Sequence, residues 1–266
     1  MKNDCRTHHK HQGISLVELL VGLAISFVVL SGVTQTYVSI IQSAGNTLTE
    51  TQLVQQLSSV ASVITRDVRR SGYWGNRSTV DLYNPAGNPF NQIDDTALEV
   101  HSANVQVGVT DSGECLLYSY DMDDDGILDN ADIVGFRLVS GVVEMRTRGD
   151  TAANGRHDAC SDAQDTWIAL TDVNTITINT LDFDLANSVC LNTREPDGVD
   201  NDGANGIDDA AEADCYDQAP VVGSGDISVE TRQVTLTLSA ASATNPATNA
   251  NVTQDIRIRN DLVREW

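Results

Sequence analysis

The stretch GISLVELLVGLAISFVVLSGV, residues 13–33, places one acidic residue, Glu18, in an otherwise uncharged apolar run. The run from Ile14 to Val33 holds 20 residues. At about 1.5 Å of rise per residue it forms a helix of about 30 Å, long enough to cross a hydrocarbon core. A carboxylate in such a helix is costly and indicates a specific use. We therefore predict a membrane-spanning helix in which Glu18 has a function.

A short leader precedes the apolar run, carries three basic residues (Lys2, Arg6 and Lys10) and ends at Gly13. An ordinary secretory signal has its cleavage site after the apolar run. The cut that Gly13 indicates lies before the run and keeps it in the mature chain. A plain membrane anchor explains the hydrophobicity but gives no reason for Glu18.

This arrangement resembles the type III signal of type IV prepilins and related pseudopilins. In that family a prepilin peptidase cuts after the glycine, the new N-terminus is methylated, and a glutamate five residues into the mature chain governs assembly. The resemblance implies cleavage between Gly13 and Ile14, methylation of Ile14, and a role for Glu18 in processing and assembly. Within lipid the Glu18 carboxylate needs a positive partner, and the free amine of Ile14 is the candidate that the segment offers.

The mature chain is strongly acidic. The whole chain of 266 residues has a formal net charge of −22, and removal of residues 1–13 leaves 13 basic and 37 acidic residues, a net charge of −24. Such a surface repels phosphates, so we expect no direct binding of nucleic acid. It attracts divalent cations or basic partners, and a salty habitat is another explanation of the acidity. The basic leader and acidic head also predict insertion with the leader inside and the head in the periplasm.

Cysteine usage supports export. The leader takes Cys5 with it, and the four remaining cysteines form an even set, as an exported disulfide-bonded domain requires. Of the three possible pairings we expect Cys115–Cys160 and Cys190–Cys215, because each closes a local loop. The second bond would stabilise the head by about 3 kcal/mol. A zinc site is the alternative, but the sequence has no CxxC spacing.

Beyond the apolar run the helical pattern continues. Apolar residues recur at steps of three and four, which predicts an amphipathic second half of one helix from about Ser15 to about Arg70. These residues are Leu53, Leu57, Val60, Ala61, Ile64 and Val68. The polar residues between them, Asp67 included, suit the opposite, exposed face. We divide the chain into a leader (1–13), a transmembrane or filament-core helix (14–37), an amphipathic helix (38–71) and a β-rich head with acidic loops (72–266).

The head carries strand patterns rather than further helices. After a loop region over Tyr73–Thr96, alternation and β-branched residues indicate a series of strands, and Ser140-Gly141 indicates a hairpin. The expected strands are Ala97–Val109, Cys115–Tyr120, Ile133–Val139, Val142–Arg146, Trp167–Leu170, Thr175–Leu185, Ile227–Leu238 and Val252–Arg259. One long helix followed by strands predicts an α+β fold with an antiparallel sheet packed on the helix.

This organisation resembles the type IV pilin fold, and three stretches resemble the PilW-like minor pilins: the prepilin signal, RDVRRSGYWG at residues 66–75, and TQDIRIRN at residues 253–260. The resemblance implies a minor pilin near the tip of a type IV pilus that helps to start assembly and supports adhesion, twitching motility or DNA uptake. Its implied partners are the prepilin peptidase, other minor pilins, the major pilin and a large tip adhesin. It implies the bacterial inner membrane before assembly and the cell surface afterwards. A J-type minor pseudopilin of type II secretion and a calcium-dependent adhesive module at the pilus tip are the alternatives.

The stretch DMDDDGILDNAD, residues 121–132, has the spacing of an EF-hand calcium loop. Alternating carboxylates can wrap one ion, and the glycine permits the sharp turn. The expected ligands are Asp121, Asp123, Asp125, the Ile127 carbonyl, Asp129 and Asp132. The last ligand is aspartate where the EF-hand has glutamate, and no helical pattern flanks the loop. A solvated acidic turn is the alternative, although such closely spaced carboxylates repel one another without a cation.

A second acidic stretch, residues 197–212, resembles the same loop with one extra residue before Gly206. Its potential ligands are Asp200, Asp202, Asn205, the Ile207 carbonyl, Asp208, Asp209 and Glu212. The insertion disturbs the register, and an acidic loop held by Cys190 and Cys215 is the alternative. The sequence thus suggests one or two calcium ions. It contains no GxSxG, HExxH or P-loop motif, so we expect no catalytic residues and no enzyme activity.

Overall fold

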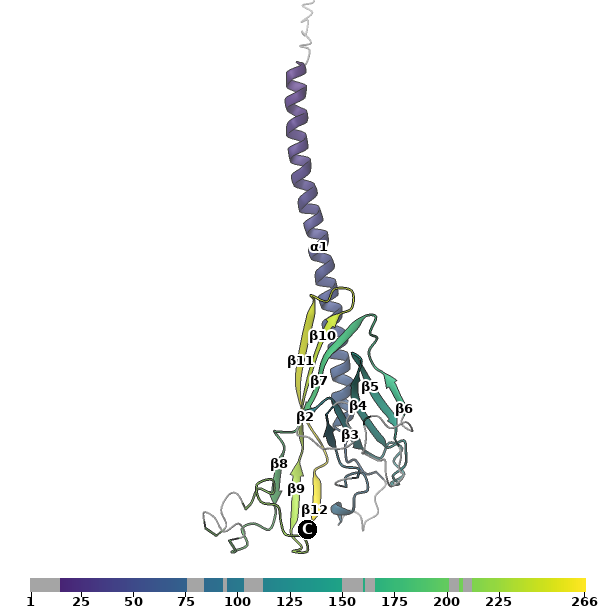
Figure 1. Ribbon diagram of the computed structural model, residues 1–266, viewed down its shortest axis with the longest axis vertical. Coiled ribbons are helices and arrows are strands. Elements are labelled where there is room, and N and C mark those ends of the chain that lie inside the picture. The colour runs from purple at the N-terminus through teal and green to yellow at the C-terminus, as the bar shows by residue number, and fades with distance from the viewer. Residues whose placement is uncertain are drawn as a thin grey trace, which may run out of the picture. The chain divides into compact units, whose positions relative to one another are not determined.

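The computed structural model describes residues 15–75, 84–92, 95–102, 112–149, 160, 166–200, 206–207 and 212–266 (Figure 1). The chain divides into two compact units, Met1–Leu48 and Thr49–Trp266. The proposed leader boundary at Gly13 lies outside the described residues.

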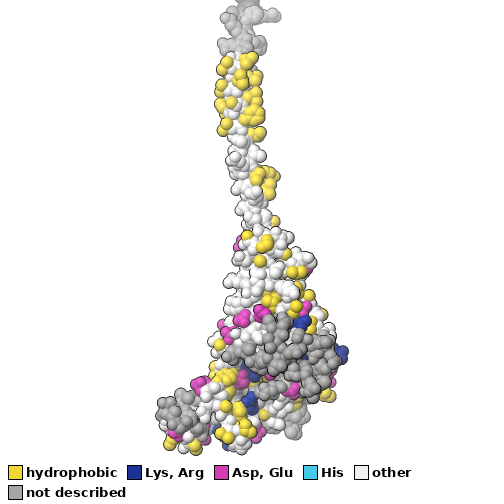
Figure 2. All heavy atoms as spheres, in the orientation of Figure 1, with side chains coloured by type: hydrophobic (Ala, Val, Ile, Leu, Met, Phe, Trp, Pro, Cys, Tyr) yellow, Lys and Arg dark blue, Asp and Glu magenta, His cyan; other side chains and the backbone are white. Residues whose placement is uncertain are grey.

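Helix α1 spans Leu16–Val68 and confirms the long N-terminal helix that the sequence predicts. Its part in the first unit is exposed along its whole length, and Figure 2 shows hydrophobic side chains gathered on its N-terminal surface. A run that is apolar on every side of a helix has no preferred face for a core. The described part of the first unit, residues 15–48, therefore contributes helix but no buried core.

The part of α1 from Thr49 onward buries one face against the strands of the head. The residues of the predicted apolar stripe are all buried there: Leu53, Leu57, Val60, Ala61, Ile64 and Val68. The helix ends at Val68, and four residues later Gly72 adopts a φ of 70°, a left-handed conformation that glycine takes without strain. The prediction that Asp67 lies on the exposed face is wrong, because only 5% of Asp67 is exposed.

The described residues of the head form three antiparallel sheets (Figure 1). The five-stranded sheet has the order β1 (Glu99–His101), β3 (Cys115–Ser119), β4 (Ile133–Val139), β5 (Val142–Arg148) and β6 (Thr166–Ala169). The four-stranded sheet has the order β11 (Asn249–Arg257), β10 (Gln233–Ser242), β7 (Ile176–Asp184) and β2 (Ser112–Gly113). The three-stranded sheet has the order β12 (Leu262–Glu265), β9 (Ile227–Thr231) and β8 (Val189–Asn192). A short 3-10 helix, η2 (Pro85–Gly87), lies in the predicted loop region.

These sheets confirm the predicted α+β class. The hairpin at Ser140-Gly141 joins β4 to β5, and both residues have positive φ, as a tight hairpin turn with the native twist requires. Part of the strand predicted over Ala97–Val109 lies outside the described residues; its described portion gives β1. The sequence analysis did not predict β2, β8 or β12, which have two, four and four residues.

The single strand predicted over Ile227–Leu238 is wrong, because the chain passes from one sheet to another at Arg232. The Arg232 guanidinium is bonded to Glu230 at 2.7 Å and donates to the carbonyl of Leu98 at 2.6 Å. These contacts hold the junction between β9 and β10. The apolar residues lie at odd positions in β9 (Ile227 and Val229) and at even positions in β10 (Val234, Leu236 and Leu238). The alternation of period two therefore changes phase at the junction, a signal that the predicted single strand overlooked.

The main core of the head lies between α1 and the inward faces of the five- and four-stranded sheets. Its strand residues include Leu116, Tyr118, Phe136, Phe183 and Leu236. Both predicted disulfides, Cys115–Cys160 and Cys190–Cys215, are confirmed. The first belongs to a smaller apolar cluster with Leu117, against which Trp167 packs.

Candidate functional site

The processing segment is only partly described. Gly13 and Ile14, the predicted cleavage and methylation residues, lie outside the described residues. Glu18 lies in the first turn of α1 and is exposed. An acidic side chain in the first turn favours the helix, because the N-terminal end carries partial positive charge. Among the described residues no basic group pairs with Glu18, so any such partner comes from the undescribed segment or from another molecule.

The N-terminal part of α1 is long and apolar enough to cross a membrane, and none of its most apolar window is buried within the chain. The core helix of a soluble domain would be mostly buried. Because this window is exposed, it is not such a core helix. Apolar surface of this extent requires lipid or another protein to cover it. The segment therefore serves as an anchor or as an assembly surface.

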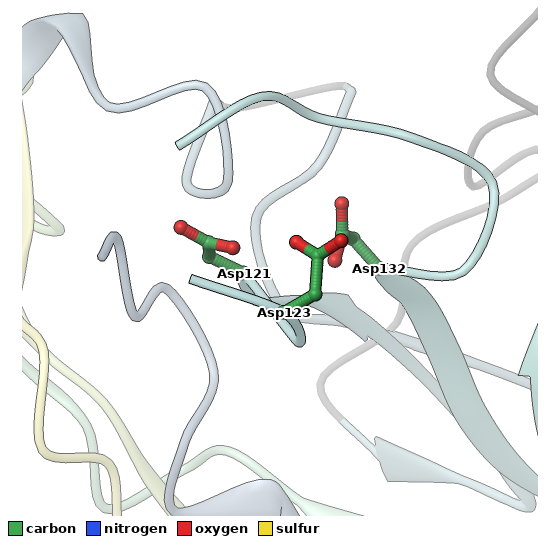
Figure 3. A group of neighbouring side chains, drawn as sticks. All are labelled: Asp121, Asp123 and Asp132. Atoms are coloured by element: carbon green, nitrogen blue, oxygen red, sulfur yellow. The ribbon is translucent and has the colours of Figure 1, made fainter. Parts of the chain in front are cut away.

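The first acidic loop connects β3 to β4, and the prediction that it lies between strands is confirmed. Asp121 follows β3 and Asp132 precedes β4; each is 2% exposed, whereas Asp123 is exposed. One carboxylate oxygen from each of these three residues lies within 4.8 Å of the other two. Figure 3 shows the three side chains converging on one small space. That arrangement offers hard oxygen ligands of the kind that Ca²⁺ binds.

Backbone amides hold the buried carboxylate of Asp121 in place. Its Oδ2 accepts hydrogen bonds from the amides of Gly126 and Gly75, each at 2.9 Å. Gly126 has a φ of 79° and makes the turn that returns its amide to Asp121, the role that the sequence assigned to this glycine. The loop is thus folded around one of its own predicted ligands.

The segment that ends α1 is fastened to this loop. The Tyr73 hydroxyl donates to Asp124 at 2.9 Å, and the Tyr73 carbonyl accepts from the amide of Asp121 at 2.9 Å. A Cβ atom at Gly75 would lie 2.6 Å from a carboxylate oxygen of Asp124 and 3.0 Å from one of Asp121, so a side chain at this position would displace Asp124 and crowd Asp121. The SGYWG stretch therefore packs directly against the acidic loop, a contact that the sequence analysis did not foresee.

Two other predicted ligands of the first loop, Asp125 and Asp129, lie outside the three-carboxylate cluster. The Asp125 carboxylate accepts from the amide of Ile127 at 2.7 Å, and the Asp129 carboxylate accepts from the amide of Ala131 at 2.6 Å. Both side chains support local turns. The structure thus brings together three of the five predicted carboxylate ligands, and the Ile127 carbonyl as a ligand stays a prediction.

Burial raises the pKa of Asp132 above its usual value of 3.8, and the charges of Asp129 and Asp121 add to the effect, while backbone amides oppose it. The amides of Met122 and Asp129 donate to its two oxygens, each at 2.8 Å. The hydrogen bonds fix the carboxylate, but the acidic neighbours still repel it. A cation between these side chains would remove that repulsion.

The second acidic loop is described in part. Asp202, Asn205, Asp208 and Asp209 lie outside the described residues. Of the remaining predicted ligands, Glu212 is buried at 1% exposure, whereas Asp200 and Ile207 are exposed. The Cys190–Cys215 disulfide encloses the loop, with a sequence separation of 25. These residues do not form a three-carboxylate cluster in the described part of the chain.

A buried polar network around Asp67 was missed at the sequence level. The hydroxyls of Tyr118 and Tyr120 donate to the two carboxylate oxygens, and Arg70 forms an ion pair with one of them. Burial, and then the Asp67 charge, raise the pKa of both tyrosines, so they remain neutral donors. The spacing contained the signal: Asp67 is three residues after Ile64, on the apolar face. Its polar character suggested the opposite face.

The long apolar helix, the antiparallel head and the N-terminal signal together define the class: this is a type IV pilin-type protein. Comparison with protein families gives two matches. The prokaryotic N-terminal methylation motif matches residues 8–34, and the family described as prepilin peptidase-dependent protein B matches residues 46–258. The chain belongs to the prepilin peptidase-dependent protein B family. Comparison with curated proteins gave no match, and comparison with solved structures gave none.

Family membership makes the chain a prepilin peptidase-dependent, pilin-like protein with a methylation motif. The motif spans the junction of leader and helix where the sequence predicts cleavage between Gly13 and Ile14. Such a chain is a substrate of the peptidase and acts in a pilus-related setting. The helix and the motif together indicate membrane anchoring and association with a pilus.

Proposed function

We propose that this protein is a minor pilin of the PilW kind, cut between Gly13 and Ile14, methylated on Ile14, and incorporated near the tip of a type IV pilus. There it would help to initiate assembly with other minor pilins, the major pilin and a large tip adhesin, and so support adhesion, twitching motility or DNA uptake. The head would reach the periplasm first and the cell surface after assembly. The chain would act without catalysis.

The observation that carries this proposal is the exposed apolar part of α1 with Glu18 in its first turn. Helices packed side by side in a filament would cover the apolar surface. The ammonium group that cleavage creates on a neighbouring subunit would neutralise Glu18. A pure lipid anchor has no use for that carboxylate.

The experiment replaces Glu18 in the full chain and measures both membrane insertion and recovery in sheared surface filaments. Glu18→Ala should insert normally but fall about tenfold or more in filaments, because removing one partner of a buried charge pair leaves the other charge uncompensated, at a cost of about 3–5 kcal/mol. Glu50→Ala, a change of the same type at an exposed position in the second half of α1, serves as the control and should leave incorporation unchanged. Wild-type recovery of Glu18→Ala would refute the proposed role.

A J-type minor pseudopilin of type II secretion shares the helix and the signal, and it is the alternative assignment. Deletion of the chain separates the two. Loss of surface pili with normal protein secretion supports the minor pilin, whereas loss of secretion with normal pili supports the pseudopilin.

We also propose that the first acidic loop binds calcium, as part of a structural or adhesive role of the head. The support is the convergence of Asp121, Asp123 and Asp132 within 4.8 Å, with two of the three carboxylates buried. The second loop would hold a further ion through Asp200, Asp202, Asn205, Asp208, Asp209 and Glu212 together with the Ile207 carbonyl. Native mass spectrometry with and without chelator counts the ions.

Calcium titration of the chelated full-length protein tests the first loop. Calcium at about a hundred times its dissociation constant should raise the free energy of unfolding by about 2.7 kcal/mol. Asp123→Asn should lose most of that gain, because its exposed carboxylate is a ligand but has a small part in holding the loop. Asp217→Asn, an exposed aspartate outside both loops, is the matched control. An equal calcium effect in wild type and Asp123→Asn would exclude this site.

A further inference from the structure

The strand β11 ends its sheet, so one of its edges has no strand beside it among the described residues (Figure 1). Its pairing with β10 runs in unbroken register from Gln233↔Arg257 to Ala241↔Asn249. Just beyond the two ends, the amide of Ser242 donates to Thr248 and the amide of Ile258 donates to Arg232, each at 3.0 Å. In an antiparallel pair, residues alternate between bonding the partner strand and pointing away from it.

That alternation determines which amides face outward. Every second residue from Thr248 to Ile258 bonds to β10 through its backbone. The residues between them direct their N–H and C=O groups to the open edge. The outward set is therefore Asn249, Asn251, Thr253, Asp255 and Arg257. An open edge of this length can accept a further strand.

A groove of about 460 Å³ lies beside this edge, between β11 and the second half of α1. Its helix wall includes Ser58, Ser62, Arg66 and Arg69, and its strand side includes Gln254 and Arg259. From Ser58 to Arg69 the helix rises about 16 Å, which matches an extended segment of about five residues. We name this surface the arginine groove.

The charge of the groove is opposite to that of the chain. The mature chain has 37 acidic and 13 basic residues. Nevertheless, no carboxylate in the described part of the chain forms an ion pair with Arg66, Arg69 or Arg259. The fourth arginine of the groove, Arg70, is paired with Asp67. The three unpaired guanidinium groups repel one another and attract carboxylates.

We propose that the β11 edge and the arginine groove together bind an extended acidic segment of another protein, which adds to the four-stranded sheet as a fifth strand. Backbone groups of the segment would pair with the outward amides of Asn251, Thr253 and Asp255. Because side chains alternate across a strand, every second one would point toward α1. Carboxylates at those positions would meet Arg66, Arg69 and Arg259. Main-chain bonds would give affinity and the arginines would give specificity.

Two other occupants fit less well. A nucleic acid would bring its phosphates against the strongly acidic remainder of the head, which opposes a long polyanion. A second copy of this chain, paired through its own β11 edge, would bring a second set of arginines and a net mature charge of −24. A short acidic segment confined to the groove avoids both penalties.

The test uses full-length protein in detergent and a labelled, end-capped peptide of four Thr-Glu repeats. A peptide of four Thr-Gln repeats and a short DNA duplex are the comparison probes. We expect the Thr-Glu peptide to bind, and the Thr-Gln peptide to bind at least about tenfold more weakly, since each lost charged hydrogen bond is worth about 1.4 kcal/mol or more. Equal binding of the two peptides, no binding of the Thr-Glu peptide, or tighter binding of DNA would overturn the proposal.

Single substitutions locate the binding surface. Arg66→Gln should weaken Thr-Glu binding about tenfold, whereas Arg194→Gln, which changes a 58% exposed arginine outside the groove, should not. Thr253→Pro removes one outward amide and should abolish most binding, while Thr253→Ala should retain it. If Thr253→Pro does not fold, amide hydrogen exchange of the wild type decides: the peptide should slow exchange at Asn251, Thr253 and Asp255.

Three results would contradict the proposed occupant. These are unchanged exchange at the β11 edge, equal loss of binding in Arg66→Gln and Arg194→Gln, and a concentration-dependent dimer of the free protein that Thr253→Pro abolishes. The experiment needs no filament. Its failure would therefore leave the proposed pilin function untouched, and a failure of that function would leave the binding result standing.

Discussion

The two halves of α1 belong to one helix but differ in what surrounds them. From Leu16 to Leu48 the apolar side chains are exposed on all sides, whereas from Leu53 to Val68 they form one stripe and are buried in the head. The difference follows from the spacing of apolar residues. Apolar residues at helical spacing form one face that packs against the sheets of the same chain. A helix that is apolar on every side needs lipid or another protein to cover it.

The acids of the two halves differ in the same way. The stretch Leu16–Leu48 contains a single charged residue, Glu18, with no basic partner among the described residues. In the second half, Asp67 receives hydrogen bonds from Tyr118 and Tyr120 and pairs with Arg70. The Asp67 carboxylate therefore has its hydrogen-bond and charge partners within the chain, whereas the Glu18 carboxylate has none among the described residues.

The largest expected effect comes from removing a buried side chain of the second half. Leu57 is fully buried, so Leu57→Ala should lower the free energy of unfolding by about 2–5 kcal/mol through lost contacts and a cavity. Leu30→Ala, at a position 65% exposed, should change it by no more than about 0.5 kcal/mol. Guanidinium unfolding of the detergent-solubilised chain, followed by tryptophan fluorescence, measures both. Similar losses would show that the first half also packs within the chain.

A smaller effect should separate the two acids. Asp67→Asn removes the charge that two tyrosine hydroxyls and Arg70 recognise, and it should lower the free energy of unfolding by about 2 kcal/mol. Glu18→Gln in the monomeric, solubilised protein should leave that quantity unchanged. The same unfolding experiment applies. A stability loss in Glu18→Gln would mean that Glu18 has a partner within its own chain.

The smallest expected effect on stability comes from replacing Asp182, one of the many acidic residues of the head. Burial, and then the charge of Asp184, raise the pKa of Asp182 above 3.8. A raised carboxyl pKa means that the folded state binds protons more tightly, so stability falls as pH rises from about 3.8 through the folded-state value. Asp182→Asn should therefore stabilise the head slightly at pH 7, and the gain should vanish below pH 3.8. A gain of equal size at both pH values would refute this origin.

The helix and most of the sheet residues were predictable because their patterns are local. The stripe from Leu53 to Val68 has helical period, and the Ser140-Gly141 turn has its own chemistry. The pairing of the cysteines also followed from loop length. At Arg232 the change of phase in the alternation marks the division locally, but the contact of Arg232 with Leu98 that holds the junction lies far away in the sequence and could not be predicted.

The candidate calcium loop was predictable in part for the same reason. Spacing identified Asp121, Asp123 and Asp132, but Asp125 and Asp129 bond to nearby amides instead of joining the cluster. Competition between an ion and the local backbone cannot be read from spacing. The support that Gly75 gives to Asp121 was also hidden, because 46 positions separate the two residues.

The position of Asp67 has a mechanical consequence. Tension applied to the N-terminal half of α1 reaches the head through the packed leucines first and through Asp67 last, near the end of the helix at Val68. The apolar contacts are close-packed but non-directional. The hydrogen bonds to Tyr118 and Tyr120 are directional, so they add a restraint at the last turn of the helix that fixes its position against the sheets more exactly than the leucines alone.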